Sequence, residues 1–335
     1  MNKILYLFFG VSELINHNQF QLSEHDLKDI YNKVRNKIYE TPCILSESLS
    51  NKYGCKIYLK LENLQKTGAF KIRGNTYKLS QMESNELSKG LVTASSGNHG
   101  LGLSLASKLN GADAEIFVPT GTPQTKINKI KSYGAKINIK GHTYDEAVMF
   151  AKSTAKTQGK IYIPSFDDEE IILGNSTLGY EVFNQVYHPN IVISPIGGGG
   201  GISGISIARE VLSPETVIYG AEAQGVESMK KSIEKGNITS LENIETMADG
   251  IKVAKPGEIT FKIVKRQVKD IKTVSEKEMK ETFKYLLFKV KLMTELAGTA
   301  AVASLDKVNF EKVDGSVVCI ITGGNIDEDL VRKIL

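Results

Sequence analysis

The sequence is poor in the residues that mark disulfide-linked or metal-binding proteins. Its 335 residues include only three cysteines, Cys43, Cys55 and Cys319, an odd number without CxxC spacing. Such a set offers neither a disulfide framework nor a zinc site, and it is typical of reduced thiols in the cytoplasm. The five histidines have no HExxH or paired-ligand spacing, so they give no support to a zinc enzyme.

A strong charge of one sign and a long apolar run are also missing. The net charge is only +4 and is spread along the chain, so we expect no nucleic-acid partner. The apolar run Ile4–Val11 is far too short to span a bilayer, and we expect no membrane partner. Because no convincing cleavage site comes after this run, we interpret residues 1–22 as an N-terminal extension and not as a targeting signal.

What the sequence does contain is a long alternation of strand and helix patterns. A helix pattern over Ser23–Glu40 and a strand pattern over Ile57–Leu61 come first, and short strands then alternate with helices from Gly90 to Pro164. The alternation resumes over Ser176–Val186, Asn190–Ile196, Ile202–Leu212, Thr216–Ala221, Glu276–Lys289, Ala297–Val308 and Ser316–Thr322. This order predicts an α/β fold with doubly wound parallel sheets, and the chain length predicts two lobes.

Ligands of such sheets bind at the carboxyl ends of the strands, and one of these ends is followed by the polar loop Ser95–Gly100. Within it, Ser95, Ser96, Asn98 and His99 place hydroxyls, an amide and an imidazole at a helix start. Together with the backbone N–H groups there, this set could bind a carboxylate or a phosphate. Serine and asparagine are also ordinary helix caps, so the loop alone leaves both interpretations open.

A second strand end carries five consecutive glycines, Gly197–Gly201. Such a run has a large entropic cost, which the close approach of a phosphate to the backbone readily explains. The run, continued by Gly204, also spells G-x-G-x-x-G, and Glu222 follows at a later strand end. That pattern is the dinucleotide fingerprint, so an NAD-dependent oxidoreductase is a rival interpretation of this loop. A third loop, Thr322–Asn325, says little by itself.

The segment Lys60–Asn75 contains three lysines that differ in their surroundings. We expect Lys60 and Lys66 to face water. Lys71 follows small residues and Phe70 at a helix start, where the helix dipole disfavours the protonated amine. A partly neutral lysine is a nucleophile that forms Schiff bases with carbonyl compounds or pyridoxal phosphate. A solvated lysine on a helix face is the ordinary alternative.

Taken together, these segments resemble the pyridoxal-phosphate-dependent β-family (fold type II), in its threonine/serine dehydratase and serine racemase branch. The resemblance runs from about residue 28 to the C-terminus. Its motifs are QKTGAFKIRG (Gln65–Gly74), SSGNHG (Ser95–Gly100), PIGGGGGISG (Pro195–Gly204), ADGIKV (Ala248–Val253) and TGGN (Thr322–Asn325). The dinucleotide interpretation becomes weak beside it, because that interpretation has no use for Lys71.

The resemblance implies two doubly wound lobes with the cofactor in the cleft between them. Residues 23–88 and 166–335 would form a large cofactor-binding domain, and residues 89–165 a small one. Lys71 would hold pyridoxal 5′-phosphate as a Schiff base and later act as the base at the substrate Cα. Further cofactor contacts would come from Phe70 against the ring, Asn98 at the ring hydroxyl, Gly197, Gly198, Gly199 and Gly200 at the phosphate, and Thr322 at the pyridine nitrogen.

The substrate side is implied less completely. Ser95, Ser96, Asn98 and His99 would bind the amino-acid substrate, and racemases use a residue at the position of Ser96 as a second acid or base. Glu222 would contribute to a site for a mono- or divalent cation, which is partial at best because position 228 is serine. The sequence departs from the family pattern at Leu101, at Glu295–Thr299 and at Gly174–Thr177.

The resulting expectation is a cytoplasmic, homo-oligomeric (dimeric or tetrameric) ammonia-lyase that converts L-threonine, and L-serine, to a 2-oxo acid and ammonia. Serine racemase is the main alternative, although the arginine that racemases carry near the substrate is missing from Tyr144–Thr157. There are two further alternatives: another β-eliminating or β-replacing enzyme of fold type II, and a cofactor-carrying protein with little turnover. Because the chain stops soon after Asn325, we expect no regulatory module and no inhibition by isoleucine.

Overall fold

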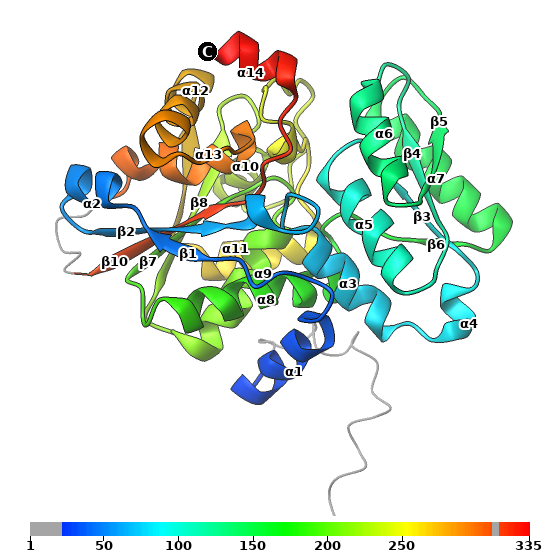
Figure 1. Ribbon diagram of the computed structural model, residues 1–335, viewed down its shortest axis with the longest axis horizontal. Helices are drawn as coiled ribbons and strands as arrows, with labels where there is room; N and C mark the ends of the chain where they lie inside the picture. Colours follow the sequence, from blue (N-terminus) through cyan, green and yellow to red (C-terminus); the bar gives the residue numbers. More distant parts are fainter. Residues whose placement is uncertain (1–21, 310–314) are drawn as a thin grey trace, which may run out of the picture.

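The computed structural model describes residues 22–309 and 315–335, which fold around two β-sheets (Figure 1). The predicted N-terminal extension, apart from residue 22, lies outside the described residues. The larger sheet has the order β1-β2-β10-β7-β8-β9, and the smaller one the order β5-β4-β3-β6. The strands of the larger sheet are Cys43–Leu45 (β1), Lys56–Leu61 (β2), Ser316–Ile321 (β10), Ile191–Pro195 (β7), Val217–Ala223 (β8) and Asp270–Val274 (β9). Those of the smaller sheet are Lys136–Ile139 (β5), Ala114–Val118 (β4), Leu91–Ala94 (β3) and Ile161–Tyr162 (β6).

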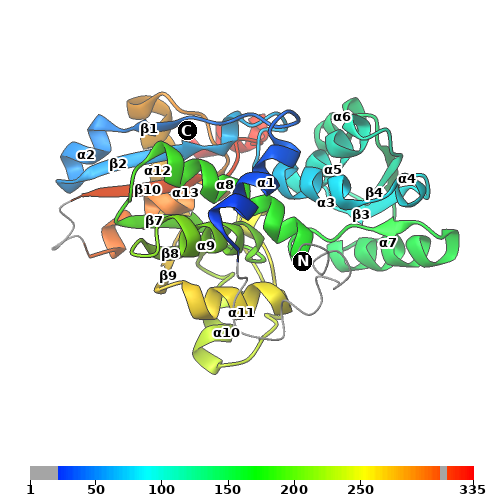
Figure 2. The same ribbon diagram turned by 90° about the horizontal axis from the view of Figure 1, so that it is seen from below.

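Helices cover both faces of each sheet, as a doubly wound fold requires. In Figure 2 the helix α7 lies on one side of the smaller sheet, and α5 and α6 lie on the other. The helices are Glu24–Val34 (α1), Glu47–Tyr53 (α2), Ile72–Gln81 (α3), Ser84–Leu87 (α4), Asn98–Leu109 (α5), Gln124–Ser132 (α6), Tyr144–Gln158 (α7), Glu169–Gln185 (α8), Gly200–Leu212 (α9), Ser228–Lys235 (α10), Glu258–Gln267 (α11), Glu276–Tyr285 (α12), Leu296–Ala303 (α13) and Glu328–Ile334 (α14).

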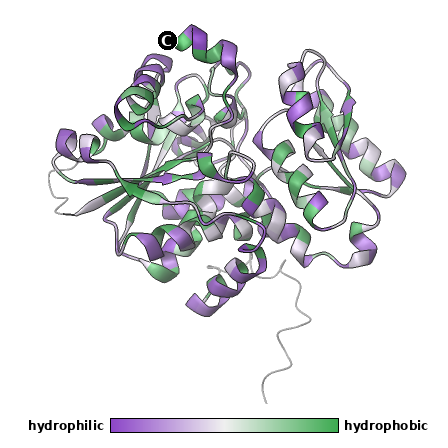
Figure 3. Ribbon diagram, viewed as in Figure 1, coloured by the Kyte–Doolittle hydropathy of each residue, from purple (hydrophilic) through white to green (hydrophobic). Residues whose placement is uncertain are grey.

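The strand β10 shows how the sequence specifies two buried faces. Its residues Val317, Cys319 and Ile321 pack with α12 and α13 in one hydrophobic cluster, whereas Val318 and Ile320 pack with α8, α9 and α11 in another. Successive side chains of a strand point to opposite faces, so a strand covered on both sides must be apolar throughout. Figure 3 shows this distribution, with hydrophobic residues along the central strands and a largely hydrophilic α1 at the periphery.

The fold class is confirmed, and several element boundaries are corrected. The strand β1 pairs with β2 in the antiparallel sense, so the larger sheet is mixed and not wholly parallel. The helix α1 ends at Val34 and not at Glu40, since the N–H of Lys37 bonds the carbonyl of Val34 three residues back, and Ile38 is buried from the segment after the helix. The helix α8 begins at Glu169, seven residues earlier than the pattern predicts, with Asp168 as its N-cap. The predicted division into domains at residues 88/89 and 165/166 stays a prediction.

A cluster of four charged side chains lies buried between β2, α3 and α8. Arg73 binds Glu62 and Glu181 at 2.7 Å each, and Lys60 Nζ lies 2.6 Å from the Oε2 atom of Glu181. All four side chains have at most 1% of their surface exposed. The expectation that Lys60 faces water is therefore wrong, because a carboxylate that is distant in sequence gives its charge a buried partner. The cluster holds the first turn of α3, where Lys71 is the N-cap residue.

We predict that Glu181→Gln lowers the free energy of unfolding by about 3 kcal/mol, because it leaves two buried cations with one carboxylate. The measurement is urea unfolding at neutral pH. Arg332→Gln breaks a pair whose side chains are 72% and 79% exposed, and this control should change stability by no more than about 0.5 kcal/mol. An equal decrease in the free energy of unfolding in both variants would show that the buried cluster stabilises the fold no more than an exposed ion pair does.

Candidate functional site

Lys71 lies at the seam between the two sheets, at the start of α3. Its Nζ atom donates a hydrogen bond to the carbonyl oxygen of Ser165 at 2.8 Å and lies 5.2 Å from the ring centroid of Phe70. Burial lowers the pKa of Lys71 to about 8, and the negative charge of Glu295 acts in the opposite direction. The predicted direction of this pKa change is confirmed, although its main cause is desolvation and not the helix dipole.

The glycine loop follows β7 and runs into α9, which begins at Gly200 and not at Ile202. Gly199 adopts a φ of 94°, in the left-handed region that favours glycine. A Cβ atom at Gly198 would lie only 2.3 Å from the ring of Phe166, and one at Gly199 only 2.8 Å from Met229. Side chains are therefore excluded here, and the first turn of α9, whose N–H groups have no acceptor within the helix, borders the cleft.

Asn98 begins α5 and is held between the side chains of Glu295, at the start of α13, and Asn325, which follows β10. Its amide donates to Glu295 Oε1 at 2.8 Å, and its carbonyl oxygen accepts from the amide of Asn325 at 2.7 Å. Thr322 directly follows β10, and its backbone carbonyl accepts a hydrogen bond from the N–H of Phe70 at 3.1 Å. The loops at residues 95–100 and 322–325, which are more than two hundred residues apart, therefore meet beside Lys71.

Glu295 is a functional candidate that the sequence motifs did not single out. It is the N-cap residue of α13, its exposure is 8%, and it lines the same cleft as Lys71. Burial raises the pKa of Glu295 to about 7, and the hydrogen bond from Asn98 acts in the opposite direction. The sequence signal was weak: Glu295 itself matches the first residue of a family pattern, but the pattern is altered at other positions of Glu295–Thr299.

One cleft of about 2260 Å³ collects the predicted residues of the cofactor and the substrate sites. Among the residues that line it are Phe70, Lys71, Ser95, Ser96, Asn98, His99, Gly197, Gly198, Gly199, Gly200 and Thr322. This donor set fits pyridoxal phosphate, because a buried amine of lowered pKa shares a cleft with a helix start from which side chains are excluded. The individual contacts to cofactor and substrate stay predictions.

His99 lines the cleft, but only 4% of its surface is exposed. Both ring nitrogens lie within hydrogen-bonding distance of protein atoms. The neighbours of the ring nitrogens are Asn75, Thr93 and Ile163. A contact between His99 and the substrate stays a prediction.

Glu222 lies outside the cleft, at the end of β8. Its carboxylate accepts hydrogen bonds from the N–H groups of Met229 and Lys230, both at 2.9 Å, and burial raises its pKa to about 8. No cluster of three or more histidine, cysteine or acidic side chains suited to a metal occurs within residues 22–309 and 315–335. Cation binding at Glu222 stays a prediction.

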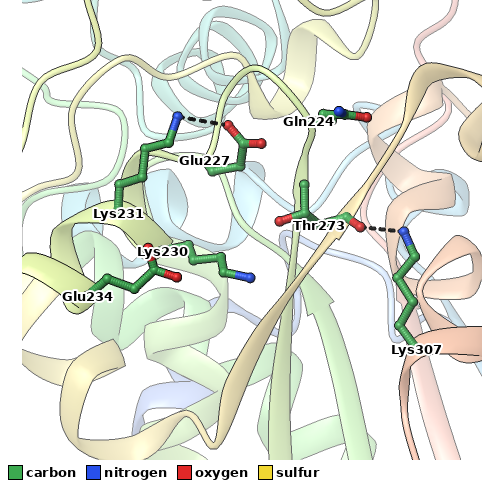
Figure 4. A pocket seen from close by; sticks show the side chains of 7 residues that line it. All are labelled: Gln224, Glu227, Lys230, Lys231, Glu234, Thr273 and Lys307. Carbon is green, nitrogen blue, oxygen red and sulfur yellow. Dashed lines mark hydrogen bonds and ion pairs between the residues drawn. The ribbon is translucent and has the colours of Figure 1, made fainter.

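A smaller pocket of about 400 Å³ is lined by residues of α10, by Thr273 of β9 and by Lys307 (Figure 4). Its charged side chains are largely paired, since Lys231 binds Glu227 at 3.3 Å and Lys307 donates to the carbonyl of Thr273 at 2.6 Å. None of the predicted cofactor or substrate residues lines it. The predicted cofactor and substrate residues line the large cleft instead.

Comparisons with known proteins agree with the predicted family. Residues 34–323 match the model of the family described as pyridoxal-phosphate dependent enzymes. An L-threonine ammonia-lyase from Thermotoga maritima is 37% identical, over 92% of this chain and 77% of its own length. The structure of maize serine racemase has a TM-score of 0.88 and 29% identity, over 93% of this chain and 96% of that one. The processed form of threonine deaminase isoform 2 from Solanum lycopersicum has a TM-score of 0.86 and 32% identity, over 93% of both chains.

Two further observations concern the rest of the chain. All three cysteines are free thiols. Within the described residues, every helix is too short or too polar to cross a membrane.

We predict that the Lys71 amine titrates with a midpoint near pH 8, and not near the 10.5 of an ordinary lysine, in the full chain freed of cofactor. The amine is reactive when neutral, so the rate of its acetylation by acetic anhydride should rise as the pH passes 8. The acetylated fraction is read from peptide masses, and the exposed Lys33 serves as the reference lysine. Glu295→Gln should move the midpoint lower, because the negative charge that favours the ammonium form is removed. A midpoint above pH 10 would make Lys71 an ordinary solvated lysine.

Proposed function

This chain belongs to the family of pyridoxal-phosphate-dependent enzymes, and we propose that within it the protein is an L-threonine ammonia-lyase that also accepts L-serine. The observation that carries the proposal is the buried Lys71 amine, which shares one cleft with the glycine loop and with Asn98. The similarity to the Thermotoga maritima and Solanum lycopersicum proteins supports threonine as the substrate.

Five parts of the cleft would hold the cofactor. Lys71 would bind its aldehyde carbon, Phe70 would pack on its ring, and Asn98 would face its ring hydroxyl. The helix start at Gly197–Gly200 would bind its phosphate, because backbone N–H groups and the helix dipole favour an anion there. A hydroxyl from Thr322 would face the ring nitrogen. When bound, pyridoxal phosphate supplies an electron-withdrawing ring that stabilises negative charge at the substrate Cα.

The residues of the chain would then divide the remaining work. The N–H groups at the start of α5, with the hydroxyls of Ser95 and Ser96, would hold the substrate carboxylate. Lys71, neutral above about pH 8, would take the Cα proton, and the resulting ammonium would return a proton to the β-hydroxyl, which would leave as water. Addition of water to the released enamine would give a 2-oxo acid and ammonia. Asn98 and Glu295 would orient each other, because their side chains are joined by a hydrogen bond of 2.8 Å.

Serine racemase is a second candidate, because Ser96 lines the same cleft as Lys71 and could serve as a second acid or base. The similarity to maize serine racemase also supports this second candidate. Elimination and racemisation share the removal of the Cα proton, and then elimination expels the β-hydroxyl whereas racemisation returns a proton to Cα. The two activities are therefore separable by their products from one incubation.

We further propose a homo-oligomer, located in the cytoplasm. Exposed apolar side chains close to the end of β2 support association, since Leu64 and Met293 are 50% and 46% exposed and lie on neighbouring segments. Light scattering on the purified chain should give a mass of twice or four times 36.8 kDa. A mass of a single chain would contradict this part of the proposal.

We predict that the purified protein forms 2-oxobutanoate and ammonia from L-threonine, and pyruvate from L-serine. Lys71→Ala should lower this rate by about 10³-fold or more, because the nucleophile and base are removed together. The control is Lys66→Ala, a matched change in the same segment at a lysine that lies over the ring of Tyr39. Chiral analysis of the serine incubation measures racemisation at the same time. Formation of D-serine without pyruvate would show a racemase and contradict the lyase. If no pyruvate and no D-serine form, both proposed activities are refuted.

A further inference from the structure

A chain of hydrogen bonds leads from the backbone of Lys71 into α5. Asn75 lies one helical turn after Lys71, and only 1% of its surface is exposed. Its amide nitrogen donates to the carbonyl of Lys71 at 2.8 Å and lies 3.3 Å from His99 Nδ1. Because a carbonyl only accepts hydrogen bonds, the orientation of this amide follows from its contact with Lys71. The two hydrogens of the amide therefore serve Lys71 and His99.

His99 continues the chain toward the smaller sheet. Its Nε2 atom lies 3.2 Å from the carbonyl of Ile163 and 3.1 Å from the hydroxyl of Thr93, which itself donates to Ile163 at 2.7 Å. Nε2 must carry the ring hydrogen, because the carbonyl of Ile163 can only accept. Nδ1 is then free to accept from Asn75, so one tautomer satisfies both contacts.

The ring stays neutral in this setting. Burial and the positive charge of Lys71 lower the pKa of His99 to about 3, while the hydrogen bond to Ile163 acts in the opposite direction. Glu295, which is hydrogen-bonded to Asn98, is the acidic group that acts on Lys71. A neutral imidazole adds no positive charge beside the amine, so its contribution is geometric.

The series of hydrogen bonds that starts at the Lys71 carbonyl ends just after β6, close to the acceptor of the Lys71 amine. Ile163 stands two residues before Ser165, whose carbonyl accepts the hydrogen bond from Lys71 Nζ at 2.8 Å. Both ends of Lys71, its backbone carbonyl and its amine, are thus tied to the segment 163–165. On this basis we infer that His99 and Asn75 are positioning residues that hold the Lys71 amine in its reactive place. This inference rests on the proposed function, in which Lys71 carries out the chemistry.

The packing around Asn75 makes the connection rigid. A Cβ atom at Gly102 would lie 2.9 Å from the amide of Asn75 and 3.1 Å from the backbone carbon of Lys71. The helices α3 and α5 therefore touch at this point, and Asn75 has little room to turn. Both ring nitrogens of His99 already have protein neighbours, so this role takes the place of the predicted contact between His99 and the substrate.

The test compares His99→Leu and Asn75→Ala with two reference variants of the full chain. His99→Gln retains a donor and an acceptor, and Ser104→Ala removes an unconnected buried hydrogen bond to Gly100 in the same helix α5. Pyridoxal 5′-phosphate is added to each cofactor-free chain, and the growth of its visible absorbance band gives the rate of attachment. The kcat and KM values for L-threonine and the Tm are measured on the same preparations.

We expect His99→Leu and Asn75→Ala to slow attachment and to lower kcat by about tenfold or more, with KM changed by less than about threefold. His99→Gln should recover most of both rates, and Ser104→Ala should lower Tm without changing either rate. The two disruptive variants break the same chain of contacts at different points, so the result does not depend on one of them folding.

Attachment rates equal to those of Ser104→Ala would overturn the inference. A raised KM with an unchanged attachment rate would also overturn it and would return His99 to the role of a substrate ligand. Failure of the wild-type chain to develop the absorbance band would refute the proposed function and this inference together. A normal wild-type band with unaffected variants would refute the inference alone.

Discussion

The structure depends above all on the removal of one amine from water. Lys71 is held at the seam of two sheets, where its Nζ atom donates to the carbonyl of Ser165 and forms no ion pair within the described residues. A pKa of about 8 in place of 10.5 corresponds to roughly 3 kcal/mol of disfavour for the ammonium form. The surrounding structure must supply at least that much, and the buried cluster around Arg73 anchors the helix that carries the amine.

Lys60 and Lys71 show that one residue type serves opposite purposes within a short segment. Lys60 is buried against Glu181 at 2.6 Å, so its charge is paired and its role is structural. Lys71 has a neutral carbonyl as its hydrogen-bond acceptor, so burial weakens its hold on the proton. The difference between the structural cation Lys60 and the proposed nucleophile Lys71 therefore comes from partners that lie far away in the sequence.

Local patterns predicted what depends on local physics. The strand predicted over Ser316–Thr322 agrees with β10, Ser316–Ile321, to within one residue, and this apolar strand lies in the centre of its sheet as its composition requires. The early start of α8 escaped prediction, because its first turns are buried and lack a clear helical period. The paired charge of Lys60, the place of Glu295 in the cleft and the enclosed ring of His99 all depend on long-range packing. A single sequence does not display such contacts.

The central claim is that Lys71 carries pyridoxal phosphate, and it can be tested directly by chemical trapping. The purified protein is treated with sodium borohydride, which converts a C=N bond between an amine and the cofactor into a stable linkage, and it is then digested for peptide mass mapping. The account predicts the mass of the reduced cofactor on the peptide that contains Lys71 and on no other lysine. A reduced cofactor on a different lysine, or on none, would contradict it.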